Sequence, residues 1–398
     1  MKPPRIGLRC DAGPRTGVGH LVRCLALGEE FLARGARVEL FGTVERVGWA
    51  SAQLTARGIP VRPGPDTPAG LVEAARRHAL DALVLDSYEL DPAGAGALRA
   101  AGVVTLAIVD GDTRGQDADL YLDQNFGADT PAPAHGLPDG PTDDRPDGPA
   151  DDTPGGPADD GPADGAPGGG APGAGRPGGR MLAGVRYALL RDAVTAARPA
   201  APPPASPTQR PRVLAFFGGT DAVGAAPVLA RVLFDTGHPL ELTVVVGRPE
   251  IGAELAQVVP GRGQSLHPVA PTDALPTLIG AADLVVSAAG TSTWELCCLG
   301  APAALVCVVD NQRDSYRRVV AHGLAAGLGE LPDLIAPGLA GRTARADAAR
   351  TLRTLLASPR RRAALAARAW ATVDGHGRTR VADAVLARIA DRTGVLNP

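Results

Sequence analysis

The sequence predicts an α/β protein built from two parallel β-sheets, each covered by helices on both faces. Short apolar segments alternate with segments that are apolar at helical spacing, before residue 124 and again after residue 212. Most of the apolar segments end at an acidic residue or a glycine-bearing turn. Strands that are apolar throughout are typical of parallel sheets buried on both faces. We therefore expect two Rossmann-like domains that face each other across a cleft.

The first domain is expected to span residues 1–127. Its first strand is residues 6–9, and residues 21–34 are apolar at helical spacing up to Gly35, a residue type that commonly ends helices. Four further apolar segments are expected to be strands, at residues 38–44, 82–86, 103–110 and 119–123.

Residues 128–180 interrupt this alternation and consist almost wholly of Pro, Gly, Ala and Asp. The segment contains near-repeats of the type GPADD, and Leu137 is its only large apolar residue apart from the flanks. Such a composition cannot bury enough apolar surface to offset the entropy of ordering. We expect a disordered insert; an acidic partner-binding segment is the alternative.

The second domain is expected to span residues 181–398, and its strand–helix alternation restarts near residue 212. Four apolar segments are expected to be strands, at residues 213–217, 242–246, 284–287 and 303–308. Residues 344–392 are rich in Ala, Leu and Arg and are expected to form closing helices. In open parallel sheets the ligand binds at the carboxyl ends of the strands, so the turns that follow these segments are the candidate sites.

Charge and cysteine content exclude several classes of function. The net charge of −3 gives no electrostatic case for binding nucleic acid or a membrane surface. The five cysteines form no CxxC pattern and are odd in number, which fits a reducing cytoplasm better than a disulfide framework. No apolar run approaches the ~20 residues of a membrane span, and the N-terminus lacks a signal core. We expect a cytoplasmic monomer whose partner is a small molecule.

The first candidate site is the turn Gly17-Val18-Gly19-His20, which follows the first strand and opens the first helix. Glycines allow backbone N–H groups to approach a ligand, and the helix N-terminus adds partial positive charge. The third glycine of a dinucleotide-binding fingerprint is absent. The helix dipole disfavours imidazolium, which leaves a neutral imidazole suited to general base catalysis. A histidine that merely caps the helix is an equally good interpretation.

The second candidate is the turn that begins at Gly290 and Thr291, where a strand leads into a helix. Its N–H groups and hydroxyls form a suitable seat for phosphate. Glu295 lies about one turn into that helix, where a carboxylate can accept hydrogen bonds from two ribose hydroxyls. An acid favoured by the helix dipole is the alternative.

Three further strand ends carry candidate residues. The double glycine of Gly218-Gly219-Thr220 invites close approach by a diphosphate, although a plain tight turn would need the same residues. The amides of Asn311 and Gln312 suit sugar hydroxyls and N-acetyl groups. Tyr88, in Asp86-Ser87-Tyr88, ends a strand of the first domain and can face the cleft. Ordinary polar loop residues are the alternative for the last two.

Taken together, these motifs resemble one family, the UDP-2,4-diacetamido-2,4,6-trideoxy-β-L-altropyranose hydrolases of pseudaminic acid biosynthesis. The resemblance covers most of the chain outside the insert and the last ~60 residues. The matching motifs are Arg9-Cys10-Asp11-Ala12, Gly17-Val18-Gly19-His20, Arg23-Cys24-Leu25-Ala26-Leu27, Asp86-Ser87-Tyr88, Tyr187-Ala188-Leu189-Leu190-Arg191, Phe217-Gly218-Gly219-Thr220-Asp221, Gly290-Thr291-Ser292-Thr293-Trp294-Glu295 and Asp310-Asn311-Gln312. The second half is also similar to the glycosyltransferase that adds N-acetylglucosamine to the peptidoglycan lipid precursor.

This resemblance implies the glycosyltransferase-B fold and removal of UDP from an amino-sugar nucleotide. Inversion at the anomeric carbon follows if a single water displaces UDP. It implies that His20 activates water, that the glycine turns hold the diphosphate and that Glu295 holds the ribose. Asp11 and Tyr88 lie in matching motifs and are counted as further catalytic candidates. The insert is foreign to the family's compact pattern, so the exact sugar is less certain than UDP.

Two alternatives to a hydrolase stay open. A glycosyltransferase needs the same cleft and a comparable base, but passes the sugar to an acceptor hydroxyl. A non-catalytic nucleotide-sugar binding protein is the second alternative. We expect neither a cofactor nor a metal, because no DxD motif accompanies a phosphate loop in the second domain and helix N-termini can neutralise the leaving diphosphate.

Overall fold

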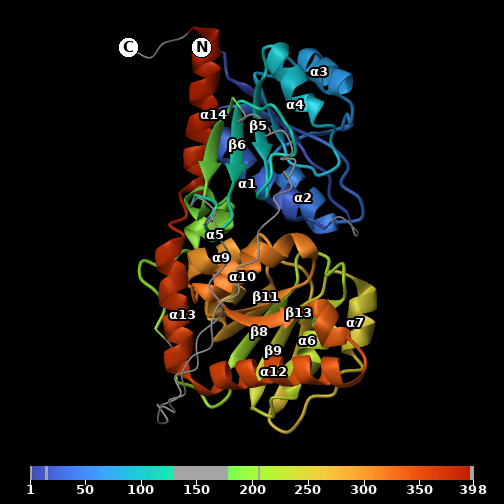
Figure 1. Cartoon of the computed structure of the whole chain (residues 1–398), viewed down its shortest axis with the longest axis vertical. Helices are drawn as coiled ribbons and strands as arrows, with labels where there is room; N and C mark the ends of the chain where they lie inside the picture. The colour runs from blue at the N-terminus through green and yellow to red at the C-terminus, as the bar shows by residue number, and fades with distance from the viewer. Residues whose placement is uncertain (1, 14–16, 130–177, 205–206, 395–398) are drawn as a thin grey trace, which may run out of the picture. The chain divides into compact units, whose positions relative to one another are not determined.

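The computed structural model describes residues 2–13, 17–129, 178–204 and 207–394 of the chain. Within these residues the chain forms two parallel β-sheets with helices on both faces of each (Figure 1). The predicted α/β class with two Rossmann-like domains is confirmed. The disorder predicted for residues 128–180 falls almost entirely on residues 130–177, which lie outside the described residues.

The first sheet has the strand order β3-β2-β1-β4-β5-β6-β7, and each neighbouring pair is parallel. In its central strand, Ile6 lies opposite Val38 on one side and Ala82 on the other. The parallel arrangement brings the carboxyl ends of the strands to one edge. The strands are β1 (Arg5–Arg9), β2 (Arg37–Phe41), β3 (Val61–Arg62), β4 (Ala82–Leu85), β5 (Val104–Ile108), β6 (Leu120–Asp123) and β7 (Arg180–Ala183).

Alternating side chains of these strands enter two different cores, as the two-residue period of a strand requires. Ala82 and Val84 pack with residues of α1 (Gly19–Ala33), α2 (Gly48–Ala56) and α14 (Gly377–Thr393). Leu83 and Leu85 pack with residues of α3 (Pro68–Arg77) and α4 (Ala93–Ala100). Both faces of the sheet are therefore buried, which is why its strands lack polar alternation.

The second sheet has the strand order β10-β9-β8-β11-β12-β13 and is also parallel. The four strands expected here correspond to β8, β9, β11 and β12. The sequence pattern misses β10 and β13 because half of β10 is polar and β13 contains two glycines. The strands are β8 (Arg212–Phe216), β9 (Leu240–Val245), β10 (Gln264–Val269), β11 (Leu284–Ala288), β12 (Ala303–Cys307) and β13 (Ala326–Glu330).

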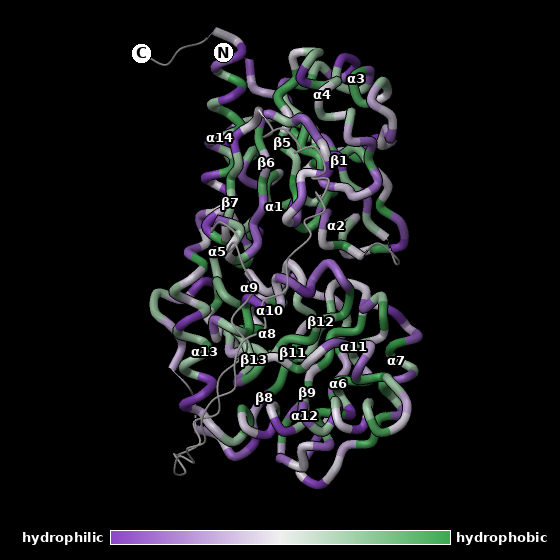
Figure 2. Tube along the Cα trace, in the orientation of Figure 1, coloured by the Kyte–Doolittle hydropathy of each residue, from purple (hydrophilic) through white to green (hydrophobic). Residues whose placement is uncertain are grey.

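Two helical layers cover the second sheet, and Figure 2 shows apolar residues along the strands of both sheets. One core contains α6 (Ala225–Phe234), α7 (Pro249–Leu255), α11 (Leu331–Ile335) and α12 (Gly338–Ala357). The other contains α5 (Asp192–Ala196), α8 (Leu275–Ala281), α9 (Ser292–Leu299), α10 (Arg313–Ala321) and α13 (Pro359–Thr372). Two short 3-10 turns, η1 (Val185–Tyr187) and η2 (Asp310–Gln312), complete the described elements.

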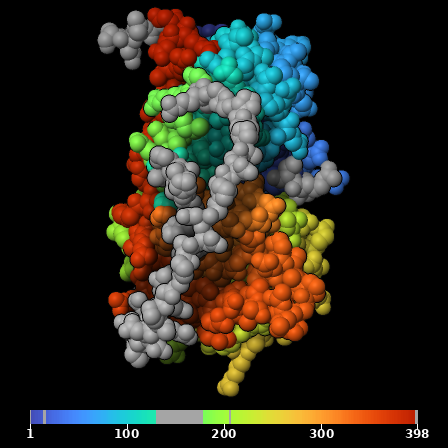
Figure 3. All heavy atoms as spheres, viewed as in Figure 1, coloured from blue at the N-terminus to red at the C-terminus, as the bar shows by residue number. Residues whose placement is uncertain are grey.

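The expected domain boundary at residue 181 does not coincide with the boundary between the sheets. β7 pairs with β6 in the first sheet, where Arg180 lies opposite Leu120. The helix α14, expected to close the second domain, packs against α1 and buries Val381 and Val385 in the first core. Figure 3 shows its red atoms beside those of the first half. Helical spacing in the sequence indicates an apolar face but not which sheet that face covers.

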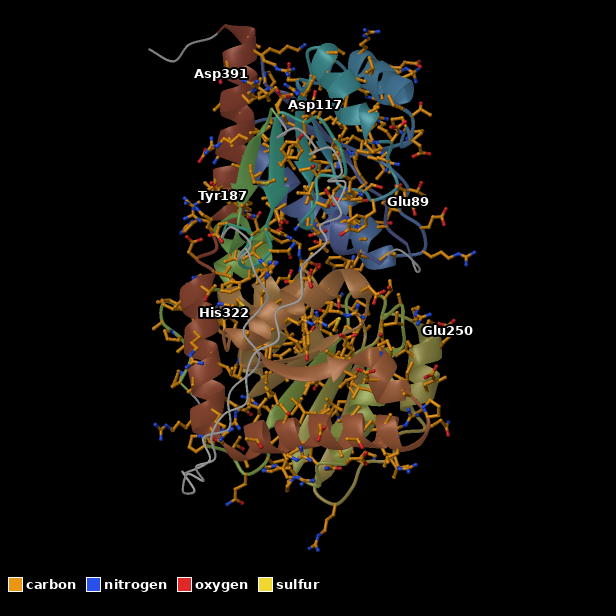
Figure 4. The ribbon with its side chains drawn as sticks, in the orientation of Figure 1. Glu89, Asp117, Tyr187, Glu250, His322 and Asp391 are labelled. Carbon is orange, nitrogen blue, oxygen red and sulfur yellow. The ribbon has the colours of Figure 1, made fainter. Side chains whose placement is uncertain are left out.

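Buried acids of the first half anchor α14 along its length. Asp119, at 4% exposure, accepts hydrogen bonds from Arg392 at 2.8 Å and from Arg388 at 3.2 Å. Glu29 of α1 accepts from Arg378 at 3.0 Å and from the backbone N–H of Asp192 at 2.6 Å. Figure 4 labels Tyr187, which lies near the start of α14, and Asp391 near its end.

Candidate functional site

A cavity of about 410 Å³ lies at the carboxyl ends of strands from both sheets. Its lining includes every site residue predicted from the sequence except Asp11: Gly17, Gly19, His20, Tyr88, Gly218, Gly219, Thr220, Gly290, Thr291, Glu295, Asn311 and Gln312. These residues come from turns far apart in the sequence, so the fold brings together what the sequence offers only as separate candidates.

His20 is the second residue of α1 and is hydrogen-bonded to a buried carboxylate. Its Nδ1 lies 2.6 Å from Oδ1 of Asp86, which follows β4 and is 1% exposed. The pKa of Asp86 is lowered: burial raises it, but the charges of Arg23 and His20 outweigh burial. An ionised Asp86 only accepts hydrogen bonds, so Nδ1 must carry the hydrogen. Nε2 of a neutral His20 then has a free lone pair, as a general base requires.

Arg23 lies one turn after His20 on α1 and bridges two strand ends. Its Nη2 and Nε donate to the two oxygens of Asp86 at 2.7 and 3.1 Å, and its Nη1 donates to Asp110 at 3.2 Å. Asp110 follows β5, and its pKa is lowered because the Arg23 charge and the Tyr88 hydrogen bond outweigh burial. The guanidinium thus favours the ionised form of the buried Asp86 and of the partly buried Asp110. Nη2 also lies 3.0 Å from Nδ1 of His20 but cannot donate to a nitrogen that carries hydrogen.

Tyr88 contacts both Asp110 and His20. Its hydroxyl donates to Asp110, and its ring meets that of His20 edge-on, with centroids 5.0 Å apart. Burial and the Asp110 charge raise the pKa of Tyr88, so the phenol remains protonated. Asn125, two residues after β6, donates to the other oxygen of Asp110 at 3.0 Å. The carboxyl ends of β4, β5 and β6 therefore all contribute to the surroundings of His20.

Asp11 does not belong to this site. Its carboxylate accepts a hydrogen bond from Arg9 at 2.6 Å and another from the backbone N–H of Thr43 at 2.8 Å. Both partners belong to the ends of β1 and β2, and Asp11 is not among the residues that line the cavity. Asp11 therefore joins the ends of β1 and β2 and does not line the cavity with His20, so its placement does not support the catalytic role predicted for it.

The glycine turns of the two halves approach each other closely. A Cβ atom on Gly219 would lie 2.4 Å from Cγ2 of Val18, and one on Gly19 would lie 3.6 Å from the Thr291 hydroxyl. Gly218 has a φ of +70°, which favours glycine. Arg248 stabilises the same turn by donating a hydrogen bond to the carbonyl of Thr220 at 2.9 Å. The N–H groups of this turn are thereby fixed at the cavity wall.

Glu295 is the fourth residue of α9 and is buried beside Arg191. Arg191 Nη2 lies 3.5 Å from the Glu295 carboxylate, and the guanidinium stacks over the Trp49 ring at 5.1 Å. Burial raises the pKa of Glu295 more than Arg191 lowers it. Neither interpretation drawn from the sequence included an arginine partner. The carboxylate lines the cavity and keeps only this long contact among the described residues, so it has capacity to accept further hydrogen bonds.

Asn311 and Gln312 lie in η2, after β12. Gln312 Oε1 accepts from the backbone N–H of Val308 at 3.1 Å, which turns its Nε2 towards Gly290. A Cβ on Gly290 would lie 3.3 Å from that nitrogen. Asp310 is paired instead with Arg313 and is exposed. The amide pair thus borders the second glycine turn.

Polar lining residues that the sequence did not assign a role include Arg23, Asp110, Asn125 and Arg191. The three-residue spacing of His20 and Arg23 on one helix could have paired them, since such residues share a face. Asp110 was noted only as a strand-ending acid. Asn125 and Arg191 lie in irregular segments, where no periodic signal exists.

Two features bear on the chemistry that this site can support. In the described ranges, no group of three or more His, Cys, Asp or Glu side chains is arranged to hold a metal ion. No described helix is both long and apolar enough to cross a membrane.

Comparison with known proteins identifies the fold. No protein-family model and no curated protein matches the chain. Among solved structures it is similar to MurG of Acinetobacter baumannii, with 15% identity, a TM-score of 0.59 and coverage of 97% of this chain and 100% of that one. It is also similar to MnaA of S. aureus solved with UDP, with 10% identity, a TM-score of 0.59 and 99% and 98% coverage. The spinosyn rhamnosyltransferase SpnG shares 15% identity with a TM-score of 0.53 and 95% and 100% coverage. The chain therefore has the glycosyltransferase-B fold.

Proposed function

We propose that the protein is an enzyme that cleaves the bond between a sugar and UDP, transferring the glycosyl group to an oxygen nucleophile activated by His20. One observation carries this proposal: a histidine whose Nδ1–H is held by buried Asp86 lines the same cavity as two glycine turns and the carboxylate of Glu295. General base, phosphate seat and ribose acceptor are the three parts that such a reaction needs.

The second half supplies the groups that suit a nucleoside diphosphate. The turns at Gly218-Gly219 and Gly290-Thr291 follow neighbouring strands, β8 and β11, and present N–H groups and hydroxyls to the cavity. Glu295 has free acceptor capacity for the ribose hydroxyls. The MnaA structure with UDP, which has the same fold, supports UDP as the nucleotide. The cavity volume falls within the range of small-molecule sites.

The chemistry follows from the position of the imidazole. Nε2 of His20 takes a proton from the nucleophile, whose oxygen forms a bond with the anomeric carbon. The bond from that carbon to the diphosphate oxygen breaks, and UDP leaves with the electron pair. The imidazolium that forms is stabilised by Asp86 at 2.6 Å, and a single displacement inverts the anomeric centre.

The nucleophile is a hydroxyl in one candidate and water in the other. An acceptor hydroxyl, which makes the protein a glycosyltransferase, is supported by the likeness to the rhamnosyltransferase SpnG. Water, which makes it a hydrolase, is supported by the sequence motifs around His20, Tyr88 and Glu295 that resemble the UDP-diacetamido-trideoxy-hexose hydrolases. Both use the same base and the same leaving group, so they differ only in what occupies the space beside Nε2.

The test measures UDP release from UDP-N-acetylglucosamine and from a UDP-linked diacetamido-trideoxy-hexose, without an acceptor and with a panel of hydroxyl acceptors. Release without acceptor identifies a hydrolase, and release only with acceptor identifies a transferase. His20→Asn is expected to lose roughly 100- to 10,000-fold in turnover while UDP binding is kept. His267→Asn, on an exposed histidine outside the cavity, is the matched control. Tight UDP binding without any turnover would favour a binding protein, and absence of UDP binding would overturn the proposal.

A further inference from the structure

The side chains around His20 form a closed ring of contacts. Asp86 accepts a hydrogen bond from His20, and Arg23 donates to both Asp86 and Asp110. Tyr88 donates to Asp110, and its ring packs edge-on against the imidazole of His20. The ring draws on α1 and on the ends of β4 and β5. Only His20 and Tyr88 belong to the part expected to act on substrate, so the three charged members need another explanation.

Arg23 is the member on which the others depend. It is 3% exposed and donates to both carboxylates, using the fork of Nε and Nη2 for Asp86 and Nη1 for Asp110. Without a shared cation, the buried Asp86 carboxylate and the partly buried Asp110 carboxylate would repel each other, which favours protonation. A protonated Asp86 could donate its own hydrogen to Nδ1 of His20, which would move the imidazole hydrogen to Nε2 and remove the base.

We propose that Arg23 is a positioning residue that selects the tautomer of His20 with hydrogen on Nδ1, and that through Asp110 it also fixes Tyr88 against the imidazole. The catalytic consequence rests on the proposed function, because a free Nε2 lone pair matters only if His20 acts as a base. The tautomer itself does not rest on it.

The geometry explains why an arginine is needed at this place. Nη2 and Nε donate to separate oxygens of Asp86, which fixes the plane of the carboxylate and aims Oδ1 at Nδ1. Lysine presents a point charge and cannot hold both carboxylates in fixed planes. The other titratable groups near Asp86 are Cys24, whose Sγ lies 4.0 Å from Oδ2, and Cys10, which neighbours Cys24. The hydrogen bond with Cys10, together with burial, raises the pKa of the Cys24 thiol, so it adds no charge.

The first measurement is made on the free full-length protein. Long-range proton–nitrogen NMR correlation of ¹⁵N-histidine protein reports which nitrogen of His20 carries hydrogen at neutral pH, with His20→Asn assigning the signal. We expect hydrogen on Nδ1 in the wild type. In Arg23→Gln we expect a loss of that preference, and in Arg23→Lys an intermediate result. Hydrogen on Nε2 in the wild type would overturn the proposal, whether or not the variants fold.

The second measurement is the pH profile of turnover. Removing the guanidinium leaves burial to raise the pKa of Asp86, so the acid limb of the kcat profile is expected to move to higher pH in Arg23→Gln. We expect kcat to fall at least about tenfold, a part of what a general base supplies, with little change in UDP affinity. Arg34→Gln is the matched control. Arg34 lies just after α1, forms ion pairs with Glu30 and Asp383, and does not line the cavity.

The two measurements separate the possible failures. A wild type that turns over no UDP-sugar, but whose His20 loses the Nδ1 hydrogen in Arg23→Gln, would refute the proposed function and leave the positioning role intact. An active wild type whose tautomer and acid limb are the same in folded Arg23→Gln and Arg23→Lys would refute the positioning role alone. Asp110→Asn tests the other arm: it should lower kcat through Tyr88 while the His20 tautomer stays as in the wild type.

Discussion

Gly219 packs against Val18 where the glycine turns of the two halves meet, and the contact leaves no room for a side chain on Gly219. A Cβ there would lie 2.4 Å from Cγ2 of Val18, nearer than non-bonded carbon atoms come. Val18 precedes His20 by two residues, and Gly219 precedes Thr220 by one. The position of the proposed base relative to the proposed nucleotide site is therefore set in part by this one contact.

We expect Gly219→Ala to lower kcat/KM for UDP-sugar about 10- to 100-fold, because displacement of a reacting group by about an ångström has an effect of that size. The double variant Val18→Ala with Gly219→Ala should recover most of the loss, since it restores the space. Gly280→Ala, whose Cβ meets nothing within 4 Å, is the control and should behave as the wild type. A double variant as impaired as Gly219→Ala would mean that the glycine serves the ligand directly.

Glu295→Gln separates a role in binding from a role in stability. If the carboxylate accepts hydrogen bonds from the ribose, its removal should weaken UDP binding about ten- to a hundredfold, corresponding to about 1.5–3 kcal/mol. Calorimetric titration with UDP measures this. Unchanged affinity would exclude a role in ribose binding and leave only the contact of Glu295 with Arg191.

The stability of the same variant has a pH dependence with a definite sign. The pKa of Glu295 is raised in the folded protein, so its ionised form is disfavoured by folding above that pKa. The wild type should gain stability relative to Glu295→Gln as the pH falls from neutral towards the unfolded value near 4.5. Melting temperatures of both proteins at several pH values check this. Asp86 and Asp110 behave oppositely: their pKa values are lowered, so their contribution is present above about pH 4 and lost below it.

The grouping of the candidate residues follows more directly from the sequence than the division of the chain between the two sheets. Glycine turns at strand ends are local features, and their carboxyl-edge location follows from parallel pairing, so twelve of the thirteen candidate residues line one cavity. Asp11 does not line the cavity, and its partners Arg9 and Thr43 lie at the ends of two strands whose pairing the sequence does not reveal.

Two features could not be predicted from local sequence patterns: the charged side chains around His20 and the packing of the C-terminal helix α14 on the first sheet. Arg23 and Asp110 meet only because β4 and β5 are neighbours beneath α1. Helix α14 has an apolar face that suits either sheet. Its packing on the first one includes contacts of Arg388 and Arg392 with a single buried acid, Asp119, which lies 269 and 273 residues away in the chain. Periodicity carries no information about such distant pairs.

Asp119 should be essential for holding α14. Arg388 and Arg392 both donate to it, and its other oxygen accepts from the backbone N–H of Thr105 at 2.9 Å. Asp119→Ala removes the carboxylate that the partly exposed Arg388 and Arg392 contact, and leaves the buried N–H and hydroxyl of Thr105 without their acceptor, which costs about 1–3 kcal/mol. Denaturant unfolding should show this loss. Asp391→Ala, on an exposed residue of the same helix, should stay within about 0.5 kcal/mol of the wild type.

Turnover is expected to be independent of metal ions. Helix N-termini and backbone N–H groups at Gly218-Gly219 and Gly290-Thr291 can stabilise the negative charge of the leaving diphosphate without a cation. UDP release should therefore continue in excess EDTA at its original rate. Full loss, restored by magnesium or manganese, would show that a metal bound with the substrate performs this task.

The connection between β6 and β7 sets a limit on how far residues 130–177 can be shortened. Asp129 lies beside Gly184, since a Cβ there would be 2.8 Å from the Asp129 carboxyl carbon. Gly184 follows the end of β7, whereas Gly178 precedes its start, about 20 Å away at ~3.3 Å per residue of strand. A direct link from Asp129 to Gly178 spans only ~3.8 Å and would pull β7 out of the sheet.

A deletion that leaves about a dozen residues between Asp129 and Gly178 should therefore keep fold and turnover, because loop-closure entropy changes slowly with length. The deletion must also spare Gly179 and Arg180, because Arg180 N–H donates to the Asp119 carbonyl at 2.9 Å and a Cβ on Gly179 would lie 2.1 Å from the Ala118 carbonyl oxygen. Joining residue 129 directly to 178 should lower stability and expose β6. Melting temperature and UDP release measure both variants. Loss of turnover in the dozen-residue variant with its melting temperature unchanged would instead make the segment part of the acceptor site, which favours the transferase over the hydrolase.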